Sequence, residues 1–202
     1  IINMLQDTWA LKAQREGYRS RAVYKLEEIL VKVKYNNQSC KVLDIGCAPG
    51  GWSDYLIKKY PKSSLYGIDL LDIKPVKGLK FFKGDICNID NITEIHDKKG
   101  SFDLVISDLA PNLSGIKDVD ESNVHELNLE TLRVANSYLN DSGTFIVKTF
   151  QNTLLKNFRT EMENYFSLVQ TFKPAASKSK SGEIYLYGDC LLYTSPSPRD
   201  VP

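Results

Sequence analysis

The chain has 202 residues, 42% hydrophobic and 25% charged, with a formal net charge of only +1. This composition predicts one domain with a sizeable core, and any polyanionic partner would have to bind local basic patches. No stretch approaches the ~18 consecutive apolar residues of a membrane span, so we expect no membrane partner. The four cysteines lack C-x-x-C spacing, which argues against a metal site or a disulfide framework and favours an intracellular protein of cytoplasm, nucleus or organelle.

The N-terminal segment, residues 1–40, combines basic and aromatic side chains. Ser20 is expected to cap a helix over residues 21–33, where apolar residues recur at helical spacing. Trp9 and Tyr24 lie among the basic residues. This mixture is typical of proteins that bind single-stranded RNA, because basic side chains pair with the phosphates and aromatic side chains stack on the bases. A second basic patch lies at 173–180.

The run from Lys41 to Tyr55 predicts a strand, a glycine-rich turn and a helix. Glycine in such a turn allows positive φ and a close approach of ligand to backbone. A second strand ends in Asp69, and an acid about 20 residues beyond a glycine turn holds ribose hydroxyls in doubly wound sheets. The G-x-G-x-x-G of dinucleotide sites and the P-loop pattern are both absent. A cofactor with a ribose but no phosphate fits best, and S-adenosylmethionine is the common one.

The remaining segments alternate between strand and helix patterns. Strands are expected at 41–46, 64–69, 79–83, 102–107, 143–148, 166–172 and 183–188, and further helices at 51–60, 88–97, 122–139 and 152–164. They predict an α/β fold with a seven-stranded, mostly parallel, doubly wound sheet covered by helices on both faces. The helix-free loop before the last strand predicts an antiparallel hairpin. We expect one domain over residues 1–190, and an irregular tail at 191–202 that is a candidate for non-native sequence.

Polar residues follow the predicted strands at their carboxyl ends, where open α/β sheets bind ligands. Asp85 follows strand 79–83, Asp108 follows strand 102–107, and Lys148 ends strand 143–148. A lysine at the end of a strand that should be central and buried is unusual.

These motifs together resemble the FtsJ (RrmJ) family of RNA ribose 2′-O-methyltransferases, from about Asp7 to Gly188. The matching segments are 17–22, Lys25-Leu26, 44–53, Asp69-Leu70, Gly84-Asp85, 107–112, Val147-Lys148 and 183–185. The resemblance implies a Rossmann-like methyltransferase fold with an antiparallel last strand, and S-adenosylmethionine as cofactor. It also implies a catalytic tetrad of Lys25, Asp108, Lys148 and Glu183.

The resemblance assigns roles to residues of this chain. Lys148 is interpreted as the base that takes the ribose proton and Asp108 as its orienting partner, while Lys25 and Glu183 hold the hydroxyl. The cofactor-binding residues are expected to be Gly46, Pro49, Gly50, Gly51, Trp52, Asp69, Leu70, Asp85, Ile86 and Asp108. Contacts to RNA are expected from Arg19, Arg21, Lys178 and Lys180.

The segment 107–112, read as Ser-Asp-Leu-Ala-Pro-Asn, looks more like the branch of the family that acts on large-subunit ribosomal RNA. A uridine of that RNA is therefore the expected substrate, and we expect the protein to act as a monomer. A transfer RNA anticodon loop is the alternative substrate. A non-catalytic protein of RNA binding or ribosome assembly is the alternative from another class, since fold alone does not fix function.

Overall fold

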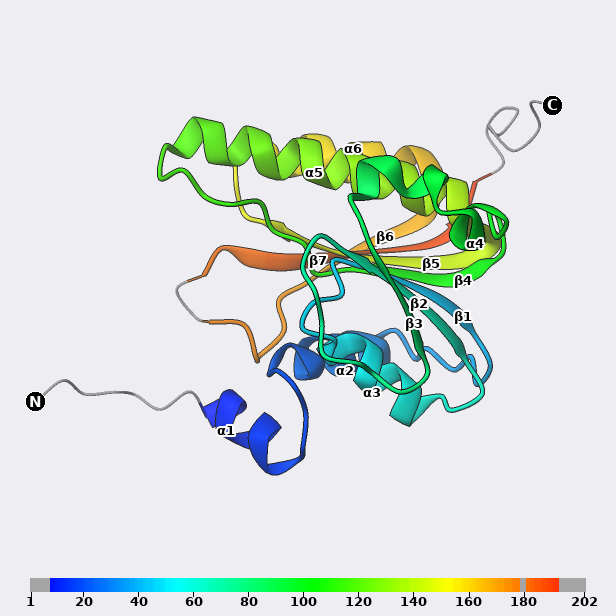
Figure 1. The fold of residues 1–202 in the computed structure, drawn as a ribbon. Coiled ribbons are helices and arrows are strands. Elements are labelled where there is room, and N and C mark those ends of the chain that lie inside the picture. The colour runs from blue at the N-terminus through cyan, green and yellow to red at the C-terminus, as the bar shows by residue number, and fades with distance from the viewer. Residues whose placement is uncertain (1–7, 179–180, 193–202) are drawn as a thin grey trace, which may run out of the picture.

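A computed structural model describes residues 8–178 and 181–192. In this part of the chain, a seven-stranded sheet has the order β3-β2-β1-β4-β5-β7-β6 (Figure 1). Its strands are β1 Lys41–Ile45, β2 Ser64–Asp69, β3 Leu79–Lys83, β4 Phe102–Ser107, β5 Leu139–Phe150, β6 Phe166–Phe172 and β7 Glu183–Leu191. The pairs among β1 to β5 are parallel, whereas β7 lies antiparallel to both β5 and β6. The predicted fold class and the antiparallel last strand are confirmed.

Helices cover both faces of the sheet (Figure 1). One face carries α1 Thr8–Arg15, α2 Ala22–Lys32 and α3 Gly51–Lys59, and the other carries the 3₁₀ helix η1 Ile86–Asn91 with α4 Thr93–His96, α5 Lys117–Tyr138 and α6 Leu155–Tyr165. Among the described residues, no helix is both long and apolar enough to cross a bilayer.

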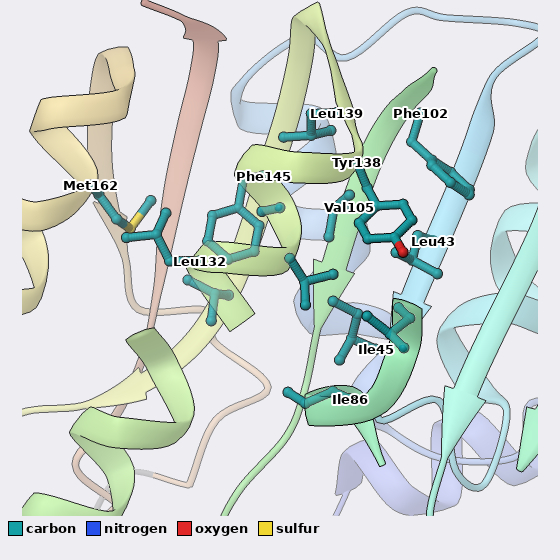
Figure 2. Close-up of a cluster of buried hydrophobic side chains, with 14 of the residues drawn as sticks. Leu43, Ile45, Ile86, Phe102, Val105, Leu132, Tyr138, Leu139, Phe145 and Met162 are labelled. Carbon is teal, nitrogen blue, oxygen red and sulfur yellow. The ribbon is translucent and has the colours of Figure 1, made fainter. Parts of the chain in front are cut away.

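Two hydrophobic cores sandwich the sheet, because successive side chains of each strand point to opposite faces. In β1, Leu43 and Ile45 pack with Tyr138 of α5 in one core, shown in Figure 2. Val42 packs in the other core with Leu26 of α2. Full burial of such side chains stabilises the fold by about 1.5–3 kcal/mol each. The two cores hold the two helical layers against the two faces of the sheet.

The structure departs from the expected elements in several places. Helix α5 begins at Lys117, before the expected start at 122, and β7 continues to Leu191, past the expected end at 188. Ser20 does not cap α2: the cap position is Arg21, without a side-chain cap hydrogen bond. The single helix expected over 88–97 is divided at Ile92, whose extended φ of −93° and ψ of 95° separate η1 from α4. The short helix α1 was not predicted, because its eight residues are fewer than the roughly 11–18 over which a helical period is recognised. Strand β5 begins at Leu139, directly after α5, and ends at Phe150, so it is longer than the expected 143–148.

Candidate active site

A cavity of about 600 Å³ lies at the carboxyl ends of β1, β2 and β4. This volume lies within the range of about 300–1,000 Å³ that is typical of small-ligand sites. Six of the predicted cofactor residues line it, namely Gly46, Asp69, Leu70, Asp85, Ile86 and Asp108. The structure therefore brings together residues from four separate predicted motifs.

The glycine turn after β1 forms one wall of this cavity. Gly46 has a φ of +72°, and a Cβ there would lie 2.2 Å from Cδ2 of Leu109, so only glycine fits without displacing that leucine. Predicted residues Pro49, Gly50, Gly51 and Trp52 belong to the described chain but are not among the lining residues. Trp52 is instead buried, and its indole N–H donates to the carbonyl of Ala22 on the α2 side (2.7 Å).

Asp69 shapes the cavity through backbone hydrogen bonds. One carboxylate oxygen accepts from the N–H of Ala48 and the other from the N–H of Leu71, both at 2.8 Å. Asp85, after β3, accepts from the N–H of Cys87 (3.0 Å) and so caps η1. Both acids line the cavity, and a carboxylate has further lone pairs that can accept hydrogen bonds from ribose hydroxyls or an amino group.

Asp44 of β1 is a fully buried carboxyl near the same strand ends. It accepts from the Ser53 hydroxyl at 2.6 Å, which ties β1 to the first turn of α3. Burial raises the pKa of Asp44 to about 7, the Ser53 hydrogen bond opposes this rise, and the charges of Asp108 and Asp69 add to it. Several acids thus converge here, and a cationic ligand would relieve their mutual repulsion.

The four residues of the predicted tetrad form two ion pairs. Lys148 Nζ lies 3.2 Å from Oδ1 of Asp108 and donates to the carbonyl oxygen of the same residue. Lys25 Nζ lies 2.7 Å from Oε1 of Glu183. Both lysine side chains are at most 10% exposed. The structure thus brings together residues from α2, the end of β4, β5 and the start of β7.

Strand pairing explains this convergence. Lys148 lies directly opposite Tyr185 in the β5–β7 ladder, and Glu183 lies opposite Phe150. Because β7 is antiparallel to β5, its first residues meet the carboxyl end of β5. Paired residues share one face of the sheet, and Tyr185 packs in the core on the α2 side, so Lys148 points toward Lys25.

Tyr185 links the two ion pairs, a role that the sequence analysis did not assign. Its hydroxyl donates to Oδ1 of Asp108 (2.8 Å) and lies 3.5 Å from Oε1 of Glu183. Burial and the charges of these two acids raise the pKa of Tyr185 well above its ordinary value, so the phenol stays protonated and donates. Burial opposes ionisation of Glu183, but the Lys25 hydrogen bond and charge outweigh it and lower the pKa of Glu183. The sequence signal that could have identified Tyr185 is its place in the segment 183–185, which matches the family.

The loop between β6 and β7 holds Glu183 in place. The Ser177 hydroxyl donates to Oε1 of Glu183 (2.9 Å), and Lys173 Nζ donates to the Glu183 carbonyl oxygen (2.6 Å). The N–H of Ala175 donates to Glu28 of α2 (2.8 Å). The loop is therefore fixed to α2, the helix that carries Lys25.

The predicted RNA contacts have different surroundings. Lys178 is exposed on the β6–β7 loop, and Lys180 lies outside the described residues. Arg21 occupies the cap position of α2. Arg19 is exposed, but its guanidinium donates to three backbone carbonyls.

Comparison with known proteins agrees with this geometry. A model of the FtsJ-like methyltransferase family matches residues 18–189. The chain belongs to the FtsJ-like methyltransferase family. The match spans the glycine turn, all four tetrad positions and Tyr185, so the resemblance drawn from the motifs is confirmed.

Relatives of this family are similar over nearly the whole chain. A protein of Coxiella burnetii named ribosomal RNA large subunit methyltransferase E is 42% identical, over 93% of this chain and 92% of its own length. One of the same name from Methanothrix thermoacetophila is 38% identical, over 93% of this chain and 73% of its own length. A crystal structure described as a ribosomal RNA methyltransferase of Plasmodium falciparum has a TM-score of 0.76 at 33% identity, covering 87% of this chain and 99% of that one.

This FtsJ-like protein is thus a methyltransferase, and its cavity fits a cofactor of the S-adenosylmethionine type. The Gly46 wall permits close approach of the ligand, and Asp69 and Asp85 offer acceptors. The acids near the strand ends complement a positive charge.

Proposed function

We propose that this protein transfers a methyl group from S-adenosylmethionine to the 2′-hydroxyl of a ribose in large-subunit ribosomal RNA. One observation carries the proposal: two lysine–carboxylate pairs, joined by the Tyr185 hydroxyl, lie where Asp108 also lines the cofactor cavity. The names and the 34–42% identity of the relatives support ribosomal RNA over transfer RNA as substrate. That the modified nucleotide is a uridine stays a prediction.

When bound, the cofactor supplies an electrophilic methyl group on a positively charged sulfur. We infer that Asp69 accepts its ribose hydroxyls and that Asp85 accepts its adenine amino group. Asp108 lies at the boundary between the cavity and the tetrad, so it meets both the methionine end and the reacting ribose. This arrangement would place the two reactants side by side, and positioning of that kind supplies much of the barrier reduction.

The tetrad residues act on the ribose hydroxyl. A 2′-hydroxyl is a poor nucleophile until its proton is removed or shared, and we infer that Lys148 accepts this proton in its neutral form. The Asp108 carboxylate and carbonyl would orient the Lys148 amine, and the Tyr185 hydroxyl donates to the same carboxylate. Lys25, held by Glu183, would donate to the hydroxyl oxygen and stabilise its developing negative charge.

Methyl transfer from labelled S-adenosylmethionine to isolated large-subunit ribosomal RNA, with transfer RNA in parallel, tests the proposal. We expect label in the ribosomal RNA, and mapping of 2′-O-methyl positions should place it on ribose. Label in transfer RNA alone would favour the anticodon-loop alternative. Binding of RNA without any transfer of label would favour the non-catalytic alternative.

Replacement of Lys148 tests the mechanism apart from folding. Lys148→Ala should lower the rate by at least the ~10² to 10⁴ that a lost general base costs. S-adenosylmethionine should still raise the melting temperature, because Lys148 does not line the cavity. Lys148→Arg should not restore activity, since a guanidinium stays protonated. Full activity of the arginine variant would mean that position 148 supplies only positive charge.

A further inference from the structure

Arg19 joins two segments of the chain that are far apart in sequence. Its Nη1 donates to the carbonyl oxygens of Lys74 (2.7 Å) and Pro49 (3.3 Å), and its Nη2 donates to that of Pro75 (2.5 Å). Pro49 belongs to the glycine turn after β1, and the other two acceptors belong to the loop between β2 and β3. One planar guanidinium thus bridges two loops.

Other residues of these two segments line the cofactor cavity. Ala48, next to Pro49, is a lining residue, and so are Leu70 and Leu71 at the start of the β2–β3 loop. Asp69 already ties the inner ends of the two segments, because its carboxylate accepts from the N–H groups of Ala48 and Leu71. Arg19 therefore joins the same two segments at a second point.

The packing around Gly50 shows that the contact is close. Gly50 has a φ of +95°, and a Cβ at this position would lie 2.8 Å from Cγ2 of Val76 and 3.6 Å from Cδ of Arg19. Val76 is buried against this turn although it lies in a surface loop. The loop carrying Lys74 and Pro75 thus packs against the glycine turn, and the Arg19 side chain lies beside this contact.

We propose that Arg19 is a positioning residue for the cofactor site, which it holds by clamping the glycine turn to the β2–β3 loop. The proposal rests on the proposed function and assigns to Arg19 a role other than the phosphate contact expected from its charge. Three of its five N–H donors are committed to carbonyls. A phosphate contact would act on RNA affinity, whereas a clamp acts on cofactor affinity.

The test compares Arg19→Gln and Arg19→Lys with the wild-type protein. We expect either substitution to weaken S-adenosylmethionine binding by about tenfold, the order expected for the loss of a charge-assisted hydrogen bond. The lysine variant keeps the charge, but a single ammonium cannot match the planar fork that reaches both loops. In steady-state kinetics, KM for the cofactor should rise while KM for RNA stays the same. The slope of RNA affinity against salt should also stay unchanged.

Matched variants separate the clamp from general effects of charge. Lys62→Gln removes one exposed positive charge before β2, at the opposite end of the strands, and should leave cofactor affinity unchanged. For Arg19→Ala, added guanidinium ion should restore cofactor affinity, and sodium chloride at the same concentration should not.

The outcomes are distinguishable. Wild-type protein that neither binds S-adenosylmethionine nor methylates RNA would refute the proposed function. Wild-type protein that binds the cofactor, with equal affinity in Arg19→Gln and Arg19→Lys, would overturn the clamp. So would an Arg19→Gln variant whose only change is a salt slope flatter by about 0.7, the loss of one contact to single-stranded phosphate.

Discussion

Asp44 should make the free protein less stable as the pH rises. Its carboxyl is fully buried, and burial raises its pKa from 3.8 to about 7 despite the hydrogen bond from Ser53. In the unfolded chain the same group returns to its ordinary pKa. Replacing Asp44 with Asn keeps an oxygen that can accept from Ser53 but removes the titration, so the variant isolates this one contribution.

The magnitude follows from the two pKa values of Asp44. Below about pH 4 the carboxyl is protonated in both states, and the pH dependence vanishes. Between about pH 4 and pH 7 the folded protein keeps a proton that the unfolded chain has released, so stability falls by about 1.4 kcal/mol per pH unit. The values differ by about three units, which corresponds to about 4 kcal/mol in total, lost as pH rises through this window and constant above it.

Urea unfolding of wild type and Asp44→Asn, without cofactor, measures this effect. We expect the stability of the variant relative to wild type to increase by about 2–3 kcal/mol between about pH 5 and about pH 8. A constant difference at every pH would refute the reasoning, whatever its sign, because a fixed cost of the amide cannot create a slope. Ser53→Ala provides a control: it removes the hydrogen bond that favours the ionised form, so the window should extend to higher pH.

Two further substitutions test the site. Tyr185→Phe should lower kcat by about tenfold to a hundredfold, the value of one hydrogen bond to a charged group, with cofactor affinity unchanged; full activity would show that the bridge to Asp108 is dispensable. Gly46→Ala should weaken S-adenosylmethionine binding and lower the melting temperature, since its Cβ would lie 2.2 Å from Leu109 at a φ of +72°. An undiminished thermal shift on adding cofactor would contradict this.

The strands were predicted well because their patterns are local. The expected ranges 64–69, 79–83, 102–107 and 166–172 coincide with β2, β3, β4 and β6. In the inner strands β2 and β4, apolar runs bounded by glycine or polar turns leave little freedom, since both faces of these two strands are buried. The edge strands β3 and β6 are partly exposed. The glycine turn and the acids at strand ends likewise identify a ligand site without any knowledge of packing.

Contacts between distant segments could not be predicted in the same way. The sequence places Arg19 in a basic segment, but its carbonyl partners belong to loops more than 29 positions away along the chain. In the sequence, Tyr185 is simply one residue of a predicted buried strand. Only the β5–β7 pairing shows that it lies opposite Lys148. Register and loop packing decide such roles, and neither is encoded in local composition.

The position of β7 has a consequence for the order in which the protein matures during synthesis. All residues that line the cofactor cavity lie between Gly46 and Glu130, so they leave the ribosome before Glu183 and Tyr185. A nascent chain can therefore assemble the cofactor site while its β5 edge is still unpaired and open to association with other strands. Insertion of β7 between β5 and β6 closes that edge and brings Glu183, the last carboxylate of the proposed tetrad, into place in the same event. The capacity to methylate should thus appear only with completion of the sheet, which couples activity to correct folding.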